Sequence, residues 1–445
     1  TDQWFCNVDM FKADTIKAIE DVQWIPEWGE ERIKNMVNMR SDWCISRQRR
    51  WGVPIPILYC EDCGKVIVND ETIKAISDMF RKESSDAWYS RDPSEFIPAN
   101  VKCECGCNKF RKEMDIFDVW FDSGCTHAAV LQERPELSWP ADLYLEGCDQ
   151  YRGWFQSSLL TSVATTGRAP YKAVCTHGWV VDGKGEVMHK SKGNVVLPEE
   201  VISKYGADVL RLWVASLDFH NDVRVSPEML KQLSEAYRKI RNTARFILGN
   251  LGNGDGFNPD TDMVSLDKLS DFDKWALSRL DSVIEKVKAS YEAFDFYLAY
   301  HAIHSFCVVD MSNFYLDIVK DTLYCSAEKS EERRAVQTTM YIILDSLVRL
   351  VAPILTFTSD EIWKYMPHKS TDDLRGVPFN QMPEKTGVEV SAEFEAKWNK
   401  IHAVRDDVLK ALEEKRTAGV IGKSLDAGVT IYADGADFEQ LSGYP

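Results

Sequence analysis

Five of the twelve cysteines lie in two short clusters with the spacing of metal ligands. Cys60 and Cys63 form the first cluster, and Cys103, Cys105 and Cys107 form the second. Four thiolates on two turns satisfy tetrahedral Zn²⁺, and a glycine after the second thiolate frees backbone amides to point at sulfur. Because glycine follows both Cys63 and Cys105, we predict one structural zinc site at Cys60, Cys63, Cys103 and Cys105. Cys107 is the competing ligand, and buried free thiols are the alternative.

A loop rich in lysine and glycine, residues 182–194, follows a predicted strand. Such a loop can bring ammonium groups to a polyphosphate, and the alternative is a solvated basic turn. Residues 178–184 match the GxxxxGK pattern, but Gly185 stands where a phosphate-binding loop has the Ser or Thr that holds Mg²⁺. We therefore predict a mobile lid and not a P-loop.

Two carboxylates flank a glycine at the end of another predicted strand. Glu146 and Asp149 lie on either side of Gly147, and Trp154 follows one turn later. A carboxylate pair can bind an ammonium group and a ribose diol, and glycine permits close backbone approach. The alternative is that Asp149 only caps the next helix.

Arg238, Arg241 and Arg245 recur at the spacing of one helical face. They can grip a phosphate backbone, or they can form a solvated face paired with acidic neighbours. The net charge of −17 excludes a bulk basic field, so any contact with RNA must use such a local patch.

The elements that carry these residues fall into two classes. Strands at 116–121, 142–147, 173–176 and 179–182 alternate with helices at 152–165 and 207–216, which predicts a parallel, doubly wound sheet with ligands at the carboxyl ends of its strands. Amphipathic helices follow Ser226, a predicted N-cap, and indicate a helical bundle. They are predicted at 227–248, 272–293, 297–321, 331–351 and 358–366, with a further helix at 392–415 and a strand at 428–432.

The composition excludes several classes of protein. The 445 residues, 44% hydrophobic and 28% charged, indicate a globular chain of about three domains and not a disordered or fibrous one. Asp345 and Arg349 interrupt the most apolar stretch, so no membrane span is predicted. No secretory signal precedes the cysteines, which favours a reducing cytosol. The chain begins with Thr1 and not with Met, which suggests a fragment.

Five stretches together resemble the class I aminoacyl-tRNA synthetases of the isoleucine, valine and leucine group, and bacterial-type isoleucine enzymes most of all. They are DWCISRQRRWGVPIP (42–56), DVWFDSG (118–124), LEGCDQYRGWFQSSLLTS (145–162), THGWVVDGKG (176–185) and MHKSKGN (188–194).

The resemblance implies a fold of class α/β plus all-α. A Rossmann-type catalytic domain, present as its C-terminal part and carrying the zinc-knuckle insertion, would precede a helical anticodon-binding bundle. The expected division is 1–58 for re-entry into the catalytic domain, 59–114 for the insertion, 115–225 for the catalytic core, 226–390 for the bundle and 391–445 for a truncated junction domain. No His-x-Gly-His occurs, so the N-terminal half with its HIGH signature and the editing domain are expected to be missing.

The resemblance also implies roles for individual residues. Residues 187–191 stand at the family's KMSKS signature, with Val187 for its first lysine and His189 for its middle serine. Cys148 and Tyr151 depart from the serine and histidine of the family's GSDQHRGW stretch. By resemblance Glu146 would hold the ammonium group, Gly147, Asp149 and Gln150 the ribose, Trp120 and Trp154 the aminoacyl side chain, His177 the adenine, Lys190 and Ser191 the phosphates, and Arg238, Arg241 and Arg245 the tRNA.

The implied function is isoleucine–tRNA ligase: activation of L-isoleucine by ATP with Mg²⁺, then transfer to tRNA-Ile, by a cytosolic monomer that spans no membrane. The fragment alone is expected to be inactive. One alternative is a valyl-tRNA synthetase fragment, because an apolar pocket separates these amino acids by only ~1–3 kcal/mol, a range for which this family is itself a standard example. The other is a non-catalytic RNA-binding module of zinc and helices.

Overall fold

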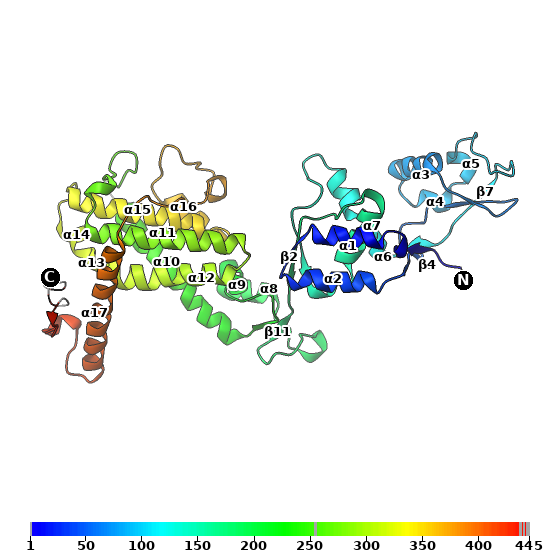
Figure 1. Ribbon diagram of the computed structural model, residues 1–445. Coiled ribbons are helices and arrows are strands. Elements are labelled where there is room, and N and C mark those ends of the chain that lie inside the picture. The colour runs from blue at the N-terminus through cyan, green and yellow to red at the C-terminus, as the bar shows by residue number, and fades with distance from the viewer. Residues whose placement is uncertain (1, 253–255, 436–437, 439–440, 442–445) are drawn as a thin grey trace. The chain divides into compact units, whose positions relative to one another are not determined.

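The computed structural model describes residues 2–252, 256–435, 438 and 441, and it divides into two compact units (Figure 1). The N-terminal unit comprises Thr1–Trp179 and His220–Asp222, and the C-terminal unit comprises Val180–Phe219 and Val223–Pro445. The predicted domain boundaries within these units stay a prediction. No helix among the described residues is long and apolar enough to cross a membrane.

A parallel sheet of strand order β2-β10-β9 lies at the centre of the N-terminal unit. Helices α1, α2 and α7 pack on it around Ile19, Ile33, Phe155 and Val174, all fully buried. The strands of this unit are β1 (Phe5–Asn7), β2 (Gln23–Ile25), β3 (Asp42–Cys44), β4 (Ser46–Arg47), β5 (Leu58–Cys60), β6 (Val66–Ile67), β7 (Phe110–Lys112), β8 (Ile116–Phe117), β9 (Tyr144–Gly147) and β10 (Ala173–His177). Its α-helices are α1 (Lys12–Glu20), α2 (Trp28–Asn38), α3 (Asp70–Glu83), α4 (Ala87–Ser90), α5 (Pro93–Phe96), α6 (Val119–Gly124) and α7 (Trp154–Thr166).

The predicted strand at 116–121 is wrong beyond its first two residues. Only Ile116–Phe117 is a strand, and it pairs antiparallel with β4 and not with β9 or β10. The chain turns at Asp118 into α6, which packs closely on α7: a Cβ on Gly124 would come within 2.9 Å of the Ser157 backbone. Tertiary packing has overridden the strand propensity of a short aromatic run.

The cysteine-containing insertion has a small core of its own. Strands β6, β5 and β7 form an antiparallel sheet, and α3 covers it through Ile76. The side chain of Asn69 caps α3 by accepting from the Thr72 amide at 2.9 Å. Trp88 fills the centre of this core and is fully buried. The insertion is thus a folded element that holds both cysteine clusters.

The C-terminal unit contains the predicted helical bundle. The Ser226 hydroxyl accepts from the Met229 amide at 3.3 Å and caps the long helix α10, as predicted. The elements of this unit are β11 (Val180–Asp182), β12 (Val223–Val225), α8 (Pro198–Tyr205), α9 (Ala207–Ala215), α10 (Pro227–Leu251), α11 (Asp271–Glu292), α12 (Phe296–Ser305), α13 (Leu316–Ile318), α14 (Lys320–Cys325), α15 (Glu331–Val351), α16 (Thr356–Tyr365) and α17 (Ala392–Thr417).

Three expectations for this unit need correction. The strand predicted at 179–182 is β11, which pairs parallel with β12 in a sheet of its own and not with β9 or β10. The helix predicted at 297–321 is interrupted: α12 passes into a π-helical segment, Phe306–Tyr315, before α13. Within that segment the Thr243 hydroxyl donates to the Cys307 carbonyl at 3.1 Å and supplies a donor from another helix. Residues 428–432 form no strand. A strand needs a hydrogen-bonded neighbouring strand, and the described part of the chain provides none there.

A buried carboxylate joins two helices of the bundle. Asp208 on α9 accepts from the amides of Phe357 and Thr358 at 3.2 and 2.7 Å and from the Thr358 hydroxyl at 2.6 Å. We expect Asp208→Ala to lower the free energy of unfolding of the C-terminal unit by about 2–3 kcal/mol, because these donors at the start of α16 lose a charged acceptor. Urea unfolding followed by circular dichroism measures the change. Asp407→Ala, at an exposed position of α17, is the control and should shift it by less than about 0.5 kcal/mol. Equal midpoints for the two variants would contradict this role.

Candidate functional site

The carboxyl ends of β9 and β10 bring four of the predicted site residues to one edge of the sheet. Glu146 pairs with Thr176, and Gly147 pairs with His177. A Cβ on Gly147 would come within 2.8 Å of Asp149 Oδ1, so glycine leaves that carboxylate in place, while His177 Cε1 lies at contact distance, 3.6 Å. Glu146, Asp149 and His177 are all exposed. The edge therefore presents two carboxylates and an imidazole to a ligand.

The turn after β9 orients Asp149 through its neighbour Gln150. The Gln150 side chain accepts from the Trp154 amide at 2.8 Å and donates to Asp149 Oδ2 at 3.2 Å. Gln150, and not Asp149, therefore satisfies the first turn of α7, so Asp149 is not that helix's cap. Its carboxylate stays available at the sheet edge.

The two tryptophans predicted to line a pocket belong to α6 and α7, two helices that pack on each other. Trp154 stacks on Tyr144 with ring centroids 4.1 Å apart, and its indole N–H donates to the Ser123 carbonyl at 3.0 Å. Trp120 is 45% exposed, and a Cβ on Gly153 would come within 3.0 Å of its ring. The start of α7 and the helix α6 thus present one aromatic ring each.

In the C-terminal unit, one aspartate shapes the lysine-rich loop. Asp182, at the end of β11, accepts from the amides of Lys184 and Glu186 and from the side chain of Asn194, each at 2.9 Å. Hydrogen bonds from Asn194 and from these amides hold the pKa of Asp182 below its usual value. Asn194 also accepts from the His189 amide at 2.9 Å. The loop is therefore folded around two side chains to which the sequence analysis gave no role.

The predicted phosphate ligands sit at the tip of this loop. Lys190 and Ser191 begin a short 3-10 turn, Lys190–Lys192, and both side chains are exposed. Lys192 forms an exposed ion pair with Glu186 at 3.2 Å within the loop. The Asp-Gly pair that opens the loop was a turn signal that could have identified Asp182 as its organiser.

The insertion gathers the thiols of Cys60, Cys63, Cys103 and Cys105 within 4.8 Å of one another. The sulfur distances are 3.6 Å for Cys60–Cys105 and 3.4 Å for Cys63–Cys103. Four sulfurs about 2.3 Å from one Zn²⁺ would stand about 3.8 Å apart, so the cluster has the size of a zinc site. Cys107 lies outside the cluster, and its sulfur accepts from the Lys109 amide at 3.3 Å.

Backbone amides point at the sulfurs of the first knuckle, as the glycine spacing suggested. Hydrogen bonds from the amides of Cys63 and Asp62 lower the pKa of the Cys60 thiol to about 6. A lowered pKa favours the thiolate form of Cys60, which is the form that binds metal. The candidate metal ligands in this group are therefore four sulfur atoms, with no carboxylate or histidine among them.

Two of the three predicted RNA-binding arginines share a hollow on the bundle. Arg241 and Arg245 line a cavity of about 260 Å³ between α10 and α16, with the exposed ring of Tyr365 beside them. Arg238 does not line it and pairs with Glu235 at 2.6 Å. Arg241 faces Glu361 at 3.6 Å. Exposed pairs of this kind are worth little, so they leave the guanidinium groups able to exchange partners.

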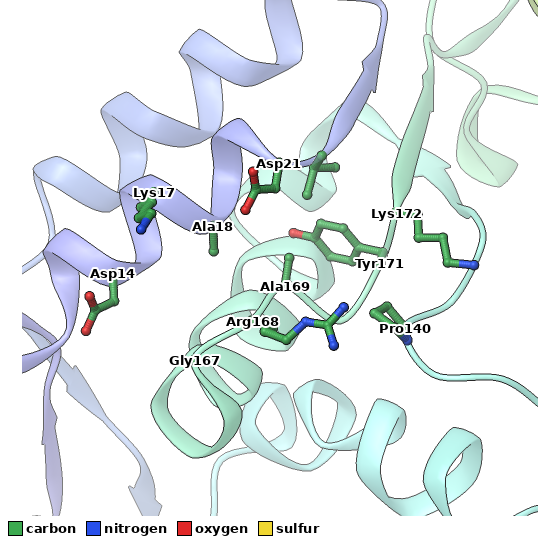
Figure 2. A pocket seen from close by; sticks show the side chains of 11 residues that line it. Asp14, Lys17, Ala18, Asp21, Pro140, Gly167, Arg168, Ala169, Tyr171 and Lys172 are labelled. Atoms are coloured by element: carbon green, nitrogen blue, oxygen red, sulfur yellow. The ribbon is translucent and has the colours of Figure 1, made fainter.

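A further hollow in the N-terminal unit holds none of the predicted site residues. It measures about 350 Å³ and lies between α1 and the chain at 167–172 (Figure 2). Asp14, Lys17 and Asp21 line it from α1 and its C-terminal end, and Arg168 and Lys172 line it from the other side, so its charges are mixed. Lys172 is also paired with Asp142 at 2.7 Å. The hollow is thus a polar surface feature, separate from the sheet edge that carries Glu146.

Comparison with known protein families identifies the fold. Residues 1–226 match the family described as tRNA synthetases class I (I, L, M and V), and residues 273–431 match the anticodon-binding domain of tRNA ligase. The chain belongs to this class I synthetase family. The parallel sheet is accordingly part of the family's Rossmann-type catalytic domain, and the helices of the C-terminal unit include its anticodon-binding bundle.

The similar curated proteins are isoleucine–tRNA ligases. The chain is 56% identical over 444 residues to the one from Caldanaerobacter subterraneus subsp. tengcongensis, which covers 100% of this chain and 47% of that protein. Identity is 54% to the one from Natranaerobius thermophilus and 52% to the one from Brevibacillus brevis, with 47% and 46% of those proteins covered. The chain thus spans about half the length of the curated relatives it matches.

Solved structures agree on the fold. A Mycobacterium tuberculosis methionyl-tRNA synthetase in complex with methionyl-adenylate superposes with a TM-score of 0.58 at 17% identity, covering 88% of this chain and 68% of that one. A LeuRS from Agrobacterium radiobacter K84, solved with tRNA and LeuAMS, gives 0.54 at 22% identity, covering 78% and 42%.

Proposed function

We propose that this chain serves an isoleucine–tRNA ligase, which activates L-isoleucine with MgATP and transfers it to tRNA-Ile. The observation that carries this proposal is the similarity of the whole chain to isoleucine–tRNA ligases at 52–56% identity. A valine enzyme has no comparable support among these relatives. The division at 1–58, 59–114, 115–225, 226–390 and 391–445 is part of the proposal, and the end of the first family match at residue 226 supports the boundary between 225 and 226.

The proposed roles follow from the chemistry of each group. Glu146 would hold the ammonium group of the amino acid, and the backbone at Gly147 would approach the ligand closely. Asp149 and Gln150 would bind the ribose hydroxyls, and His177 would lie beside the adenine. Trp120 and Trp154 would enclose the aliphatic side chain. Lys190 and Ser191 would bind the phosphates.

The first step is the in-line attack of the isoleucine carboxylate on the α-phosphate of ATP, which releases pyrophosphate. The terminal ribose hydroxyl of the tRNA then attacks the acyl carbon and releases AMP. Phosphoryl transfer of this kind needs positioning and charge stabilisation and no protein nucleophile. The groups gathered at the sheet edge, carboxylates and an imidazole without an activated serine or cysteine, suit that requirement.

Lys190 is the residue proposed to stabilise charge as pyrophosphate leaves. In an enzyme completed with the family's HIGH half, we expect Lys190→Ala to slow isoleucine-dependent pyrophosphate exchange by on the order of 10²–10³-fold, the scale of one lost charge-stabilising donor. Val187→Ala, in the same loop, is the control and should change the rate little. Small and equal effects of both substitutions would contradict the proposal that this loop acts as a lid on the phosphates.

The four-thiol cluster supports a structural zinc ion. With all four donors sulfur, a bound Zn²⁺ would have no open position for chemistry and would stabilise the insertion. We expect protein purified under reducing conditions to carry one zinc per chain, and Cys63→Ser to lose it and loosen residues 59–114 while the bundle stays folded. Cys107→Ser is the matched control and should keep the metal, because that sulfur lies outside the cluster. Metal analysis of the three proteins measures this. Absence of zinc from the unsubstituted chain would contradict the site.

Arg241, Arg245 and Arg238 are proposed to contact the tRNA, and the hollow beside Tyr365 supports the first two. A monomer in the cytosol remains our proposal for the state and location of the protein.

The sheet of the N-terminal unit ends at β9, which pairs on one side only with the described strands. Leu145 on this strand is 57% exposed, and an unpaired strand edge is a docking surface. Since no His-x-Gly-His occurs in the chain, we expect it to fold but to show no isoleucine-dependent pyrophosphate exchange alone, while weak tRNA binding by the bundle survives. Adding a HIGH-containing half, fused or as a second chain, should restore exchange. Strong exchange by the 445-residue chain alone would overturn this view.

A further inference from the structure

A buried carboxylate two positions before Trp120, that of Asp118, has no part in the proposed mechanism. Asp118, 4% exposed, stands at the start of α6, faces Arg47 at 3.2 Å and accepts from the Trp43 indole N–H at 3.4 Å. The Arg40 guanidinium lies on the Trp43 ring, 5.2 Å from its centroid, and donates to the side chain of Gln156. Burial lowers the pKa of Arg40, and the charge of Asp118 opposes that shift.

This network joins the two helices that carry the predicted pocket walls. Asp118 is the residue directly before α6, two positions before Trp120. Gln156 belongs to α7, two positions after Trp154, and is buried. Arg40 couples these two residues through Trp43, because it donates to Gln156 and lies on the Trp43 ring, whose indole N–H donates to Asp118.

Backbone contacts hold both ends of α6, and at the end that bears Trp120 the Asp118 amide donates to the Ile45 carbonyl at 2.7 Å. Gly124, at the C-terminal end, lies against the Ser157 backbone, and its carbonyl accepts from the Thr161 hydroxyl at 2.9 Å. Trp120, near the other end, is half-exposed and borders a hollow of about 250 Å³ lined by Arg40, Arg47 and Arg152. The Trp120 ring packs against Gly153 and borders this hollow, so a shift of Asp118 and of the start of α6 would move the ring relative to α7.

We propose that Asp118, held by Arg47 and Trp43 and coupled through Arg40 to Gln156, is a positioning residue that sets the spacing of Trp120 and Trp154 and thereby the amino-acid side chain the site accepts. This inference rests on the proposed function, in which those rings enclose the substrate side chain. Asp118 touches no substrate itself. Its charge acts through the placement of α6.

Asp118→Asn tests the role of the charge, because it keeps the size of the side chain and an acceptor for Trp43. In the completed enzyme we expect the kcat/KM ratio for isoleucine over valine in pyrophosphate exchange to fall about ten-fold, within the range that one methylene group can supply. The KM for isoleucine should rise, and the KM for ATP should stay within two-fold. Arg47→Lys, which keeps the charge, should retain most of the selectivity that Arg47→Gln loses. Asp78→Asn, at an exposed ion pair, is the matched control and should change nothing.

A second readout needs no catalysis. In the 445-residue chain labelled with 5-fluorotryptophan, ¹⁹F resonances assigned by single Trp→Phe substitutions report the surroundings of Trp120 and Trp154. We expect Asp118→Asn to move or broaden the Trp120 resonance, while Asp78→Asn leaves it in place. An unchanged Trp120 resonance, or unchanged selectivity in an active enzyme, would overturn the proposal. Absence of isoleucine-dependent exchange in the unsubstituted completed enzyme would instead refute the proposed function, and the resonance would still decide the role of Asp118.

Discussion

The parallel pairing of β9 with β10 is the constraint on which the sheet-edge site depends. It places Gly147 against His177 and Glu146 against Thr176, so that one sheet edge carries the carboxylates and the imidazole. A side chain at 147 would displace the Asp149 carboxylate, because a Cβ there would come within 2.8 Å of Asp149 Oδ1. A backbone register thus decides which side chains can meet, and Gln150 then fixes the direction of Asp149 and the start of α7 together.

Much of this arrangement could be predicted from the sequence, because it depends on local patterns. The strand at 142–147 and the Ser226 cap carry their signals within a few residues, and glycine after each knuckle selected the four thiols that do lie together. The resemblance assigned ligand-binding roles to residues on those elements, and those roles stay predictions. Hydrophobic period and turn chemistry suffice where an element is decided by its own residues.

The failures share a different cause. The run at 116–121 has aromatic and β-branched residues typical of a strand, yet all but two of them form a turn and the helix α6. What decides this is a contact 33 residues away, where Gly124 meets Ser157, together with the burial of Asp118 beside Arg47. Likewise the break after α12 coincides with a hydroxyl from α10, and no pattern within 297–321 encodes that neighbour. Long-range packing overrides a propensity whose whole span is about 1 kcal/mol.

In each unit a buried carboxylate helps to hold a helix in position. Asp208 and Asp118 are 6% and 4% exposed, and each is satisfied by donors distant in sequence: backbone amides of α16 for the first, a guanidinium and an indole for the second. A buried charge is costly unless every partner is in place, so it tolerates few alternative arrangements of the helices that supply them. Apolar contacts are less directional and permit small shifts at little cost. A site that must distinguish two aliphatic side chains of nearly equal size therefore gains more from a charged anchor behind its walls than from additional apolar packing around them.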